Sequence, residues 1–377
     1  MIFLHVSTGI LYNFLTSLFR LGRDMVYSSR ERCIRAIKRE EVDMIPLNLW
    51  IDTPEPLNSL LKHLNLGSYE ELLAHFKVDY RGPPGVTMVR VKLRGGFEEE
   101  VYRDEKGRIL RRDIFGVVWA LPTKGYHSLD IAHPLKKMEI EDYPWPEVDE
   151  ESLDAVIKYR KKYEDYCVMG YTLQAFEQLC RLFGFNELFK RMIRGDKTVD
   201  KALDKLFEIT YTQAKLLLEA GVDEIYNGDD VGAQSTMLIS PSLWRKYLKP
   251  RYRKLAWIIH SKGAFFHFHS DGWIEPIIPD LIEVGVDVLE PLQPETMDPA
   301  EIKRKYGDKL SFEGAISIQR TLPFGTPEQV AEEVRTRIKE LGPTGYILRP
   351  SHTILKETPL RNITTLYEVA NKYRKVK

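Results

Sequence analysis

From Gly221 onward the chain repeats one pattern, in which a short apolar, β-branched run ends in polar residues and an amphipathic stretch follows. Strands that alternate with helices of this length predict right-handed βαβ units and a parallel sheet. Together with three runs in the front half there are eight candidate strands, which suit a closed barrel better than an open sheet. We therefore expect an α/β protein with a (β/α)8 (TIM) barrel. The runs cover residues 43–50, 76–85, 165–172, 222–230, 264–272, 286–295, 310–317 and 345–353.

The stretches between these runs carry helix boundary signals. Ser240 is the expected N-cap of a helix that stops at Gly263. Thr326 is the expected cap of a later helix, which Gly342 ends. The region 173–219 is long enough for two or three helices.

One segment breaks this rhythm. Residues 86–121 alternate apolar and polar positions, with turn signals at 94–96 and 106–107, which predicts an antiparallel hairpin inserted after the second strand. On a barrel the insertion would extend a βα loop and roof the active site. A peripheral decoration is an equally weighted alternative.

The first 24 residues are apolar with polar interruptions. A signal peptide or membrane anchor is one interpretation, but no basic residue precedes the apolar part and the run is too broken to span a bilayer. We favour a helical extension, or an upstream start with true initiation at Met25. The expected organisation is an extension over 1–27 and a single barrel domain over 28–377.

Composition narrows the class of partner. The chain has 55 basic and 55 acidic side chains, and this balance removes the usual electrostatic argument for nucleic acid or an anionic membrane as the main partner. The three cysteines, Cys33, Cys167 and Cys180, show no paired spacing, which favours a reducing, cytoplasmic location. A small-molecule substrate and a monomer or homodimer are therefore expected.

Polar residues gather at the ends of the candidate strands. In a parallel barrel the interior is expected to hold apolar layers, with function at the carboxyl face. Carboxylates and imidazoles from distant strand ends would therefore converge in one mouth, where they could bind a metal or exchange protons. Of the neighbours Asp229 and Asp230, at most one is expected to enter the mouth, and we choose Asp230. The catalytic candidates are His352, Glu290 and Asp230, and the substrate-binding candidates are Arg349, Asn227, Gln293, Gln319 and Tyr171.

The segment His-Phe-His-Ser-Asp-Gly (267–272) suggests a metal site. His269 and Asp271 lie at positions i and i+2 of a strand, so both could ligate one ion, and His352 would complete a three-ligand set with an open position. His267 is the weaker candidate. The alternative is that these groups hydrogen-bond one another and a substrate without metal. For Glu290 the alternative is a salt bridge to Arg349 that organises the rim.

Several segments resemble the uroporphyrinogen decarboxylase superfamily. Residues 28–50 resemble its opening helix and first strand, and 267–293, 310–330 and 345–373 resemble its later blocks. The resemblance implies a (β/α)8 barrel, with members that are either the haem-pathway decarboxylase of porphyrin biosynthesis or methyltransferases working with corrinoids. There is no P-loop, no GxGxxG opening a helix and no GxSxG elbow in the sequence.

The two branches differ at the mouth. The decarboxylase carries an arginine-rich motif after its first strand, where this chain has Asp52 and Glu55, although His352 matches its late histidine. The methyltransferases bind zinc through an H-x-C pair and a late cysteine. His269 matches the histidine, Asp271 stands where the first cysteine would be, and His352 stands at or beside the second. The resemblance therefore favours a methyltransferase-like enzyme that binds zinc and meets a corrinoid on a partner protein.

Two alternatives stay open. One is a decarboxylase of a carboxylated substrate, with Arg349 or Arg81 as anion anchor and His352 as proton donor. The other is a non-catalytic barrel that binds a small ligand.

Overall fold

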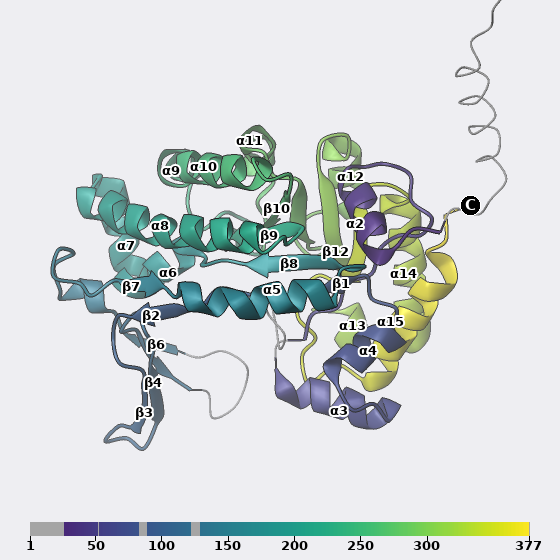
Figure 1. Ribbon diagram of the computed structural model, residues 1–377, viewed down its shortest axis with the longest axis horizontal. Coiled ribbons are helices and arrows are strands. Elements are labelled where there is room, and N and C mark those ends of the chain that lie inside the picture. Colours follow the sequence, from purple (N-terminus) through teal and green to yellow (C-terminus); the bar gives the residue numbers. More distant parts are fainter. Residues whose placement is uncertain (1–25, 52, 83–88, 122–128, 377) are drawn as a thin grey trace, which may run out of the picture.

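Seven parallel strands form the central sheet of the computed structural model, which describes residues 26–51, 53–82, 89–121 and 129–376 (Figure 1). Their order is β1-β8-β9-β10-β11-β12-β13, so neighbours along the chain pair in space, as βαβ units require. The strands are β1 (Tyr80–Arg81), β8 (Cys167–Tyr171), β9 (Glu224–Gly228), β10 (Phe265–His269), β11 (Val288–Leu292), β12 (Ser311–Ile316) and β13 (Tyr346–Pro350).

An extended segment lies where the predicted first strand was expected. The Asn48 amide donates to the Leu348 carbonyl over 3.1 Å, and the Leu47 carbonyl accepts from the Asp79 amide over 2.9 Å. The segment thus bridges β13 and the chain entering β1. It does not form a regular strand, because Pro46 has no N–H and the Leu47 amide donates to the Asp79 carboxylate instead of a main-chain carbonyl (2.9 Å).

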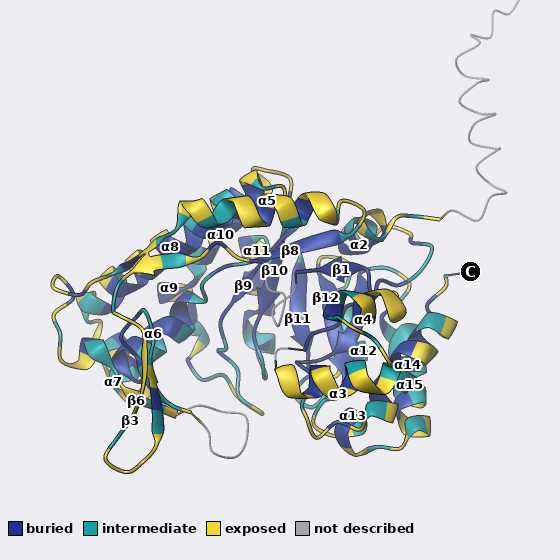
Figure 2. Cartoon of the chain, turned by 60° about the horizontal axis from the view of Figure 1, so that its bottom comes forward, coloured by how far each residue is buried: buried dark blue, intermediate teal, exposed yellow. Residues whose placement is uncertain are grey.

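Helices cover the outside of the strands (Figures 1 and 2). The predicted caps at Ser240 and Thr326 are confirmed, and Thr326 forms a full capping box with Gln329. The stretch after Ser240 is two helices rather than one, since Pro250 lies in the first turn of the second and has no N–H to continue the first. The helices are α2 (Ser29–Ile37), α3 (Pro54–Leu64), α4 (Tyr69–His75), η1 (Pro134–Lys136), η2 (Glu150–Ser152), α5 (Leu153–Lys162), α6 (Ala175–Phe183), α7 (Phe185–Arg194), α8 (Lys197–Glu219), α9 (Pro241–Tyr247), α10 (Lys249–His260), η3 (Glu275–Ile277), α11 (Ile278–Val284), α12 (Pro299–Tyr306), α13 (Thr321–Phe324), α14 (Pro327–Leu341) and α15 (Leu360–Tyr373).

Antiparallel strands interrupt the barrel pattern between β1 and β8. A four-stranded sheet in the order β3-β4-β5-β6 projects from one side of the barrel, and a two-stranded sheet joins β2 to β7 beside it (Figure 1). The first three residues of the predicted hairpin, 86–88, lie outside the described residues. The segment 122–128 and the predicted extension up to residue 25 lie outside them as well. The strands are β2 (Leu93–Gly95), β3 (Glu100–Arg103), β4 (Ile109–Arg112), β5 (Val118–Ala120), β6 (Leu129–Ala132) and β7 (Pro146–Val148).

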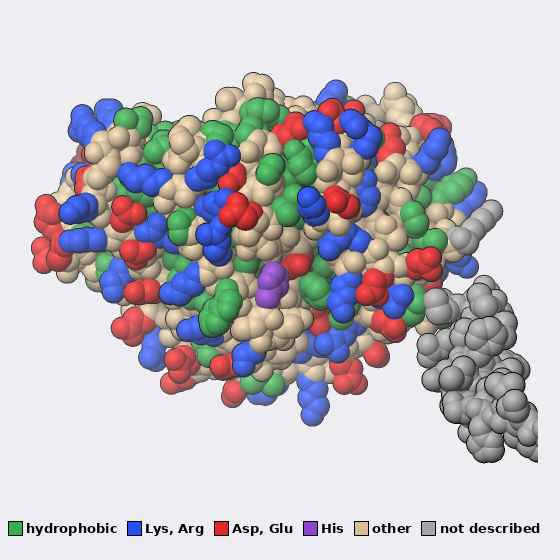
Figure 3. All heavy atoms as spheres, turned by 90° about the horizontal axis from the view of Figure 1, so that it is seen from above, with side chains coloured by type: hydrophobic (Ala, Val, Ile, Leu, Met, Phe, Trp, Pro, Cys, Tyr) green, Lys and Arg blue, Asp and Glu red, His purple; other side chains and the backbone are tan. Residues whose placement is uncertain are grey.

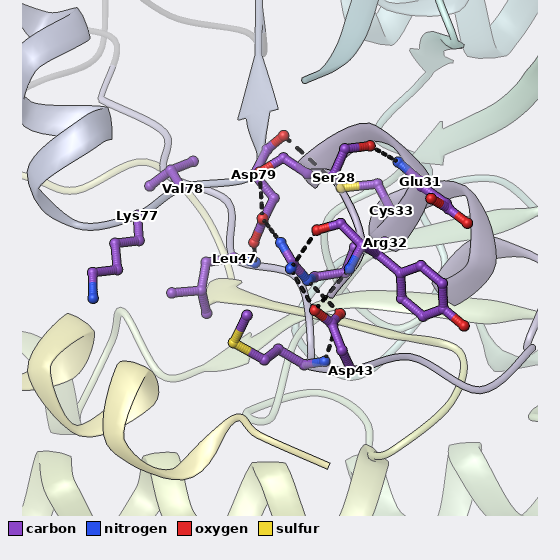
Figure 4. Close-up of polar contacts among 12 residues, drawn as sticks. Ser28, Glu31, Arg32, Cys33, Asp43, Leu47, Lys77, Val78 and Asp79 are labelled. Carbon is purple, nitrogen blue, oxygen red and sulfur yellow. Dashed lines mark hydrogen bonds and ion pairs between the residues drawn. The ribbon is translucent and has the colours of Figure 1, made fainter. Parts of the chain in front are cut away.

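A buried ion cluster lies at the amino ends of the strands (Figure 4). Arg32 of α2 contacts Asp43 at 2.7 Å and Asp79 at 2.6 Å, and Arg374 after α15 contacts Asp79 at 2.7 Å. These four side chains are 1–9% exposed. The cluster joins the first helix, the segment before β1 and the C-terminal helix at the end of the barrel away from the strands' carboxyl ends.

The face of the molecule seen from above carries no single dominant charge. On the face shown in Figure 3, basic and acidic side chains are interspersed over the helices. None of the helices in the described ranges has the length and apolar character needed to cross a membrane.

Candidate functional site

Strand β10 directs alternate side chains to opposite sides. Phe266 and Phe268 face outward and pack against Tyr252 of α10, with ring centroids 6.3 and 5.2 Å from the Tyr252 ring. His267 and His269 therefore face the barrel interior, as the period of two requires. His267 lies between two carboxylates, at 2.7 Å from Glu224 and 3.5 Å from Glu313.

The barrel interior is polar, and the expectation of apolar layers is wrong for this chain. Buried carboxylates at Glu224, Glu290 and Glu313 share the interior with the Arg349 guanidinium, which forms ion pairs with Glu290 and Glu313. Buried charges are tolerated when each has a partner of opposite sign or a hydrogen-bond donor. The side-chain amide of Asn48 supplies such a donor, with its Nδ2 at 2.9 Å from Glu313 Oε1.

Glu290, in the middle of β11, joins three side chains. Its Oε2 accepts from the Tyr226 hydroxyl at 2.9 Å and contacts His269 Nδ1 at 2.5 Å, while its Oε1 pairs with Arg349. The salt bridge to Arg349, considered as the alternative role for Glu290, is therefore present. With Nδ1 held by a fully buried carboxylate, the ring direction of His269 is fixed and its Nε2 is turned away from Glu290.

Asp230 lies beside Nε2, the ring nitrogen of His269 that faces away from Glu290. Its Oδ1 lies 3.4 Å from His269 Nε2 and accepts from the Asp271 amide at 2.8 Å. Burial lowers the pKa of His269, but the adjacent Asp230 and Asp271 carboxylates outweigh it and raise that pKa. For Asp230 burial raises the pKa, yet its contact with His269 dominates and lowers it.

Three predicted metal ligands come together at the mouth. One potential ligand atom from each of His269, Asp271 and His352 lies within 4.8 Å of the others. His352 Nε2 is 3.6 Å from Asp271 Oδ2. Burial raises the pKa of Asp271 to about 7, with His269 acting against this and Asp230 adding to it. His267 lies deeper in the barrel and is fully buried between Glu224 and Glu313.

Asp229 points away from its neighbour Asp230. It is fully buried, accepts from the Glu177 amide at 2.8 Å and contacts the Tyr252 hydroxyl. Burial and the charge of Glu177 raise its pKa to about 8. Of this pair, Asp230 is the residue beside His269.

The predicted substrate-binding residues divide into those at the mouth and those used elsewhere. Asn227 donates to Thr172 Oγ1 at 2.9 Å and to the Leu173 carbonyl at 2.7 Å, so it ties β9 to the end of β8. Gln293 accepts from the Gly272 amide at 3.1 Å and supports the loop after β10. Gln319 is exposed on the turn after β12, and no contact among the described residues joins it to the other candidates.

Tyr171 borders the mouth. Its ring stacks on Tyr226 with centroids 5.6 Å apart, and its hydroxyl contacts Gln174. Arg349 is 1% exposed and paired with two carboxylates, so it organises the interior.

Two residues at the mouth, Trp50 and Glu177, were not predicted from the sequence. The Trp50 ring contacts His352 with centroids 4.9 Å apart and lies 5.0 Å from the Arg349 guanidinium carbon. Its buried Nε1 finds no hydrogen-bond partner among the described residues. Glu177, in the first turn of α6, contacts the Asp230 amide at 3.3 Å. Trp50 ends the first apolar run, a position that marks strand ends elsewhere in the chain, whereas Glu177 has no comparable signal. Asp52 lies outside the described residues.

Comparisons with known proteins agree with this architecture. A uroporphyrinogen decarboxylase from Trichodesmium erythraeum is 22% identical over 256 residues, or 66% of this chain and 68% of the relative. A methylated-thiol–coenzyme M methyltransferase from Methanosarcina mazei is 24% identical over 202 residues, or 52% of this chain and 53% of the relative. Both named relatives are enzymes.

A solved structure described as a methyltransferase from Methanosarcina mazei superposes with a TM-score of 0.68 at 20% identity, covering 92% of this chain and 99% of the other. At this identity the likeness establishes the fold. The fold is thus uroporphyrinogen decarboxylase-like, with the parallel sheet described above.

Residues 130–373 match the family model described as uroporphyrinogen decarboxylase (URO-D). The match spans more than half of the chain, and it confirms the resemblance seen in the sequence. The chain belongs to the uroporphyrinogen decarboxylase family, with relatives among both decarboxylases and methyltransferases.

Proposed function

We propose that this chain is a metal-dependent transferase of the methyltransferase type, acting on a small molecule at the carboxyl ends of the strands. The observation that carries the proposal is the convergence of His269, Asp271 and His352, whose potential ligand atoms lie within 4.8 Å of one another. Two imidazoles and a carboxylate are a donor set that zinc accepts in catalytic sites, where a fourth position stays open for substrate.

The surroundings of His269 fit this role. Histidines that bind metals usually donate their second ring N–H to a carboxylate, which fixes the tautomer and the ring direction. Glu290 Oε2 stands 2.5 Å from His269 Nδ1 in that position. His269 Nε2 is then the nitrogen available beside Asp271 and His352. A zinc ion held there would supply Lewis acidity to a bound substrate atom.

The other mouth residues have assignable roles. Burial raises the pKa of Asp230, but its contact with His269 prevails and lowers it to about 2, so the carboxylate is ionised at neutral pH and suited to accept a hydrogen bond from a bound substrate. Trp50 Nε1 offers a buried N–H donor next to His352. Glu290 acts as a positioning residue, since both of its oxygens are already engaged by protein groups.

The chemical nature of the proposed metal ligands also indicates which class of methyl acceptor the site would favour. A carboxylate and two imidazoles are harder ligands than thiolates, and hard sites favour substrates that coordinate through oxygen or nitrogen. We therefore expect an oxygen or nitrogen acceptor rather than a thiol, with the methyl group presented by a corrinoid on a partner protein.

A decarboxylase is less well supported by the geometry. Arg349 is engaged by Glu290 and Glu313, and Arg81 by Glu70 at 3.0 Å, so both proposed anion anchors are already paired. The mouth itself carries Asp230, Asp271 and Glu177, which would repel a substrate with many carboxylates.

Metal content is the direct test. Purified protein dialysed against zinc should retain about one equivalent per chain by elemental analysis. His269→Ala and His352→Ala should lose it, because each removes one ligand. His260→Gln is the matched control, since His260 ends α10 and contacts Asp287, just before β11, at the amino ends of the strands rather than at the mouth. Equal zinc in the His269→Ala and wild-type proteins would reject the ligand assignment.

Methyl transfer is tested separately. Loss of the cobalt–methyl absorbance of free methylcobalamin should depend on the zinc-loaded wild-type protein and on an added alcohol or amine, with a thiol tested beside them for comparison. Activity with thiols alone would contradict the expected preference for harder acceptors. Carbon dioxide release from a carboxylated substrate, without methyl transfer, would favour the decarboxylase.

A further inference from the structure

A cavity of about 410 Å³ lies between the projecting antiparallel sheet and the barrel. Its barrel side is formed by the end of β8 and by α6, and its other side by β4, β5 and the turn between them. This volume falls in the range of small-molecule sites. The floor is tied together by Gln213 of α8, which accepts from the Leu173 amide at 2.9 Å and donates to the Val91 carbonyl at 2.8 Å.

The cavity contains a buried donor without a partner. Gln178 of α6 lines it and is 4% exposed, and its Nε2 makes no hydrogen bond in the described part of the chain. A buried amide N–H left unpaired loses its hydrogen bonds to water without replacement, so such groups are usually satisfied by protein or ligand. An acceptor atom on a bound molecule would satisfy this one.

Basic side chains dominate the charge of the walls. The lining includes Arg90, Lys92, Arg111 and Arg181 against Glu99 and Asp113. Arg111 is paired with Glu99 at 3.1 Å, and Arg181 with Glu177 at 3.0 Å. Within the described ranges no ion pair engages Arg90 or Lys92. The cavity is therefore suited to an anion, held chiefly from the Arg90 side.

Two aromatic rings form flat walls. Trp119 of β5 is fixed by its Nε1, which donates to Asp113 at 3.0 Å, and the Arg181 guanidinium carbon lies 5.1 Å from the Trp119 ring centre. Tyr171 lines the same cavity and stacks on Tyr226, which in turn donates to Glu290. The inner wall of the cavity is thus shared with the mouth that holds the proposed metal ligands.

We propose that this cavity is a substrate subsite that holds a planar, carboxylate-bearing part of the molecule, with Arg90 and Gln178 binding the carboxylate and Trp119 and Tyr171 contacting the flat body. The subsite rests on the proposed function for its role in catalysis, because it places the remainder of the molecule beside Tyr171 at the mouth. The antiparallel sheet is then a specificity element, since it supplies Trp119.

Binding of benzoate, compared with benzamide and acetate, tests the proposal on the full chain treated with EDTA. Ligand-observed NMR titration should show that benzoate binds and that both comparison ligands bind about tenfold more weakly, as expected for losing a charge-assisted contact or the flat body. Arg90→Gln should weaken benzoate binding about tenfold and leave benzamide binding unchanged. Arg94→Gln is the matched control, because Arg94 lies on β2 outside the cavity lining.

Gln178→Met separates a ligand-binding role from a structural one. Met has a similar volume and no polar group, so it removes the unpaired donor without opening a cavity. If the amide serves a ligand, the melting temperature is kept or raised while benzoate affinity falls. A lower melting temperature with unchanged affinity would overturn the assignment, as would equal binding of benzoate and benzamide to the wild type.

These outcomes are independent of the metal site. Metal-free protein that binds benzoate through Arg90 would support the subsite even if zinc analysis rejected the ligand set. Zinc retention without benzoate binding would reject the subsite and leave the proposed function standing.

Discussion

At the scale of single residues, the contacts of Glu290 make a sharp prediction. Glu290→Gln should weaken zinc binding about 10–100-fold, because the carboxylate that orients His269 through Nδ1 is lost. It should also destabilise the protein by about 3–5 kcal/mol, since Arg349 loses one of its two buried partners. Competition with a chelator measures the first effect and urea unfolding the second.

Glu224→Gln is the control for that prediction. Glu224 holds His267 at 2.7 Å in the same manner, but deeper in the barrel and away from the ligand set. It should lower stability while zinc affinity stays within about twofold of the wild type. Similar losses of zinc affinity in both variants would mean that general loosening of the barrel, rather than orientation of His269, explains the result.

The residues at the strand ends show what sequence can and cannot supply. Asp230, His269 and His352 were predictable, because each follows an apolar run and parallel strands bring their ends together. Trp50 was not chosen, since an aromatic residue at the end of an apolar run is more often core. Glu177 could not be predicted from the sequence, because its position beside Asp230 depends on the path of the chain from β8 into α6.

At the scale of secondary structure, local chemistry predicted boundaries well. The caps of α9 and α14 depend only on a few neighbouring residues, and both follow the sequence signals. The first run, over 43–50, looked like a strand by its apolar pattern, but the carboxylate of distant Asp79 takes its Leu47 amide. Whether a main-chain N–H pairs with a neighbouring strand or with a distant side chain depends on the tertiary fold, which the local sequence does not specify.

The capping box of α14 can be tested by one substitution. Thr326→Ala should cost about 1 kcal/mol of unfolding free energy, because the Gln329 amide loses its side-chain acceptor. Thr336→Ala makes the same chemical change in the middle of the helix, where alanine is the better helix former, and should be neutral or slightly stabilising. Equal destabilisation of both variants in urea titrations would exclude the cap as the cause.

At the scale of the whole molecule, the ion cluster opposite the mouth makes the stability of the fold depend on pH in the acid range. Burial raises the pKa of Asp43, but its hydrogen bond and charge interaction with Arg32 prevail and lower it. A carboxyl with a lowered folded-state pKa contributes stability above its unfolded pKa of about 3.9, and loses it as pH falls through the folded value.

Asp43→Asn should therefore destabilise the protein by about 3–5 kcal/mol near pH 7, with the difference shrinking below about pH 4. Urea unfolding of both proteins across this range measures the effect. Glu141→Gln is the control, because the Glu141–Lys201 pair is exposed and screened by solvent, and it should change stability little. A constant difference between the Asp43→Asn and wild-type proteins down to pH 3 would contradict the assignment.

The hydrogen bonds between the segment around Leu47 and strand β13 have a consequence for synthesis in the cell. As a ribosome makes the chain from its amino end, the early residues of this segment emerge long before Leu348, their neighbour in the finished ring. Until then the unpaired edges of β1 and the early segment are exposed to other chains, as is usual for folds dominated by distant contacts. Chaperone demand should consequently peak late in translation, and truncations that remove β13 should yield aggregates rather than a smaller barrel.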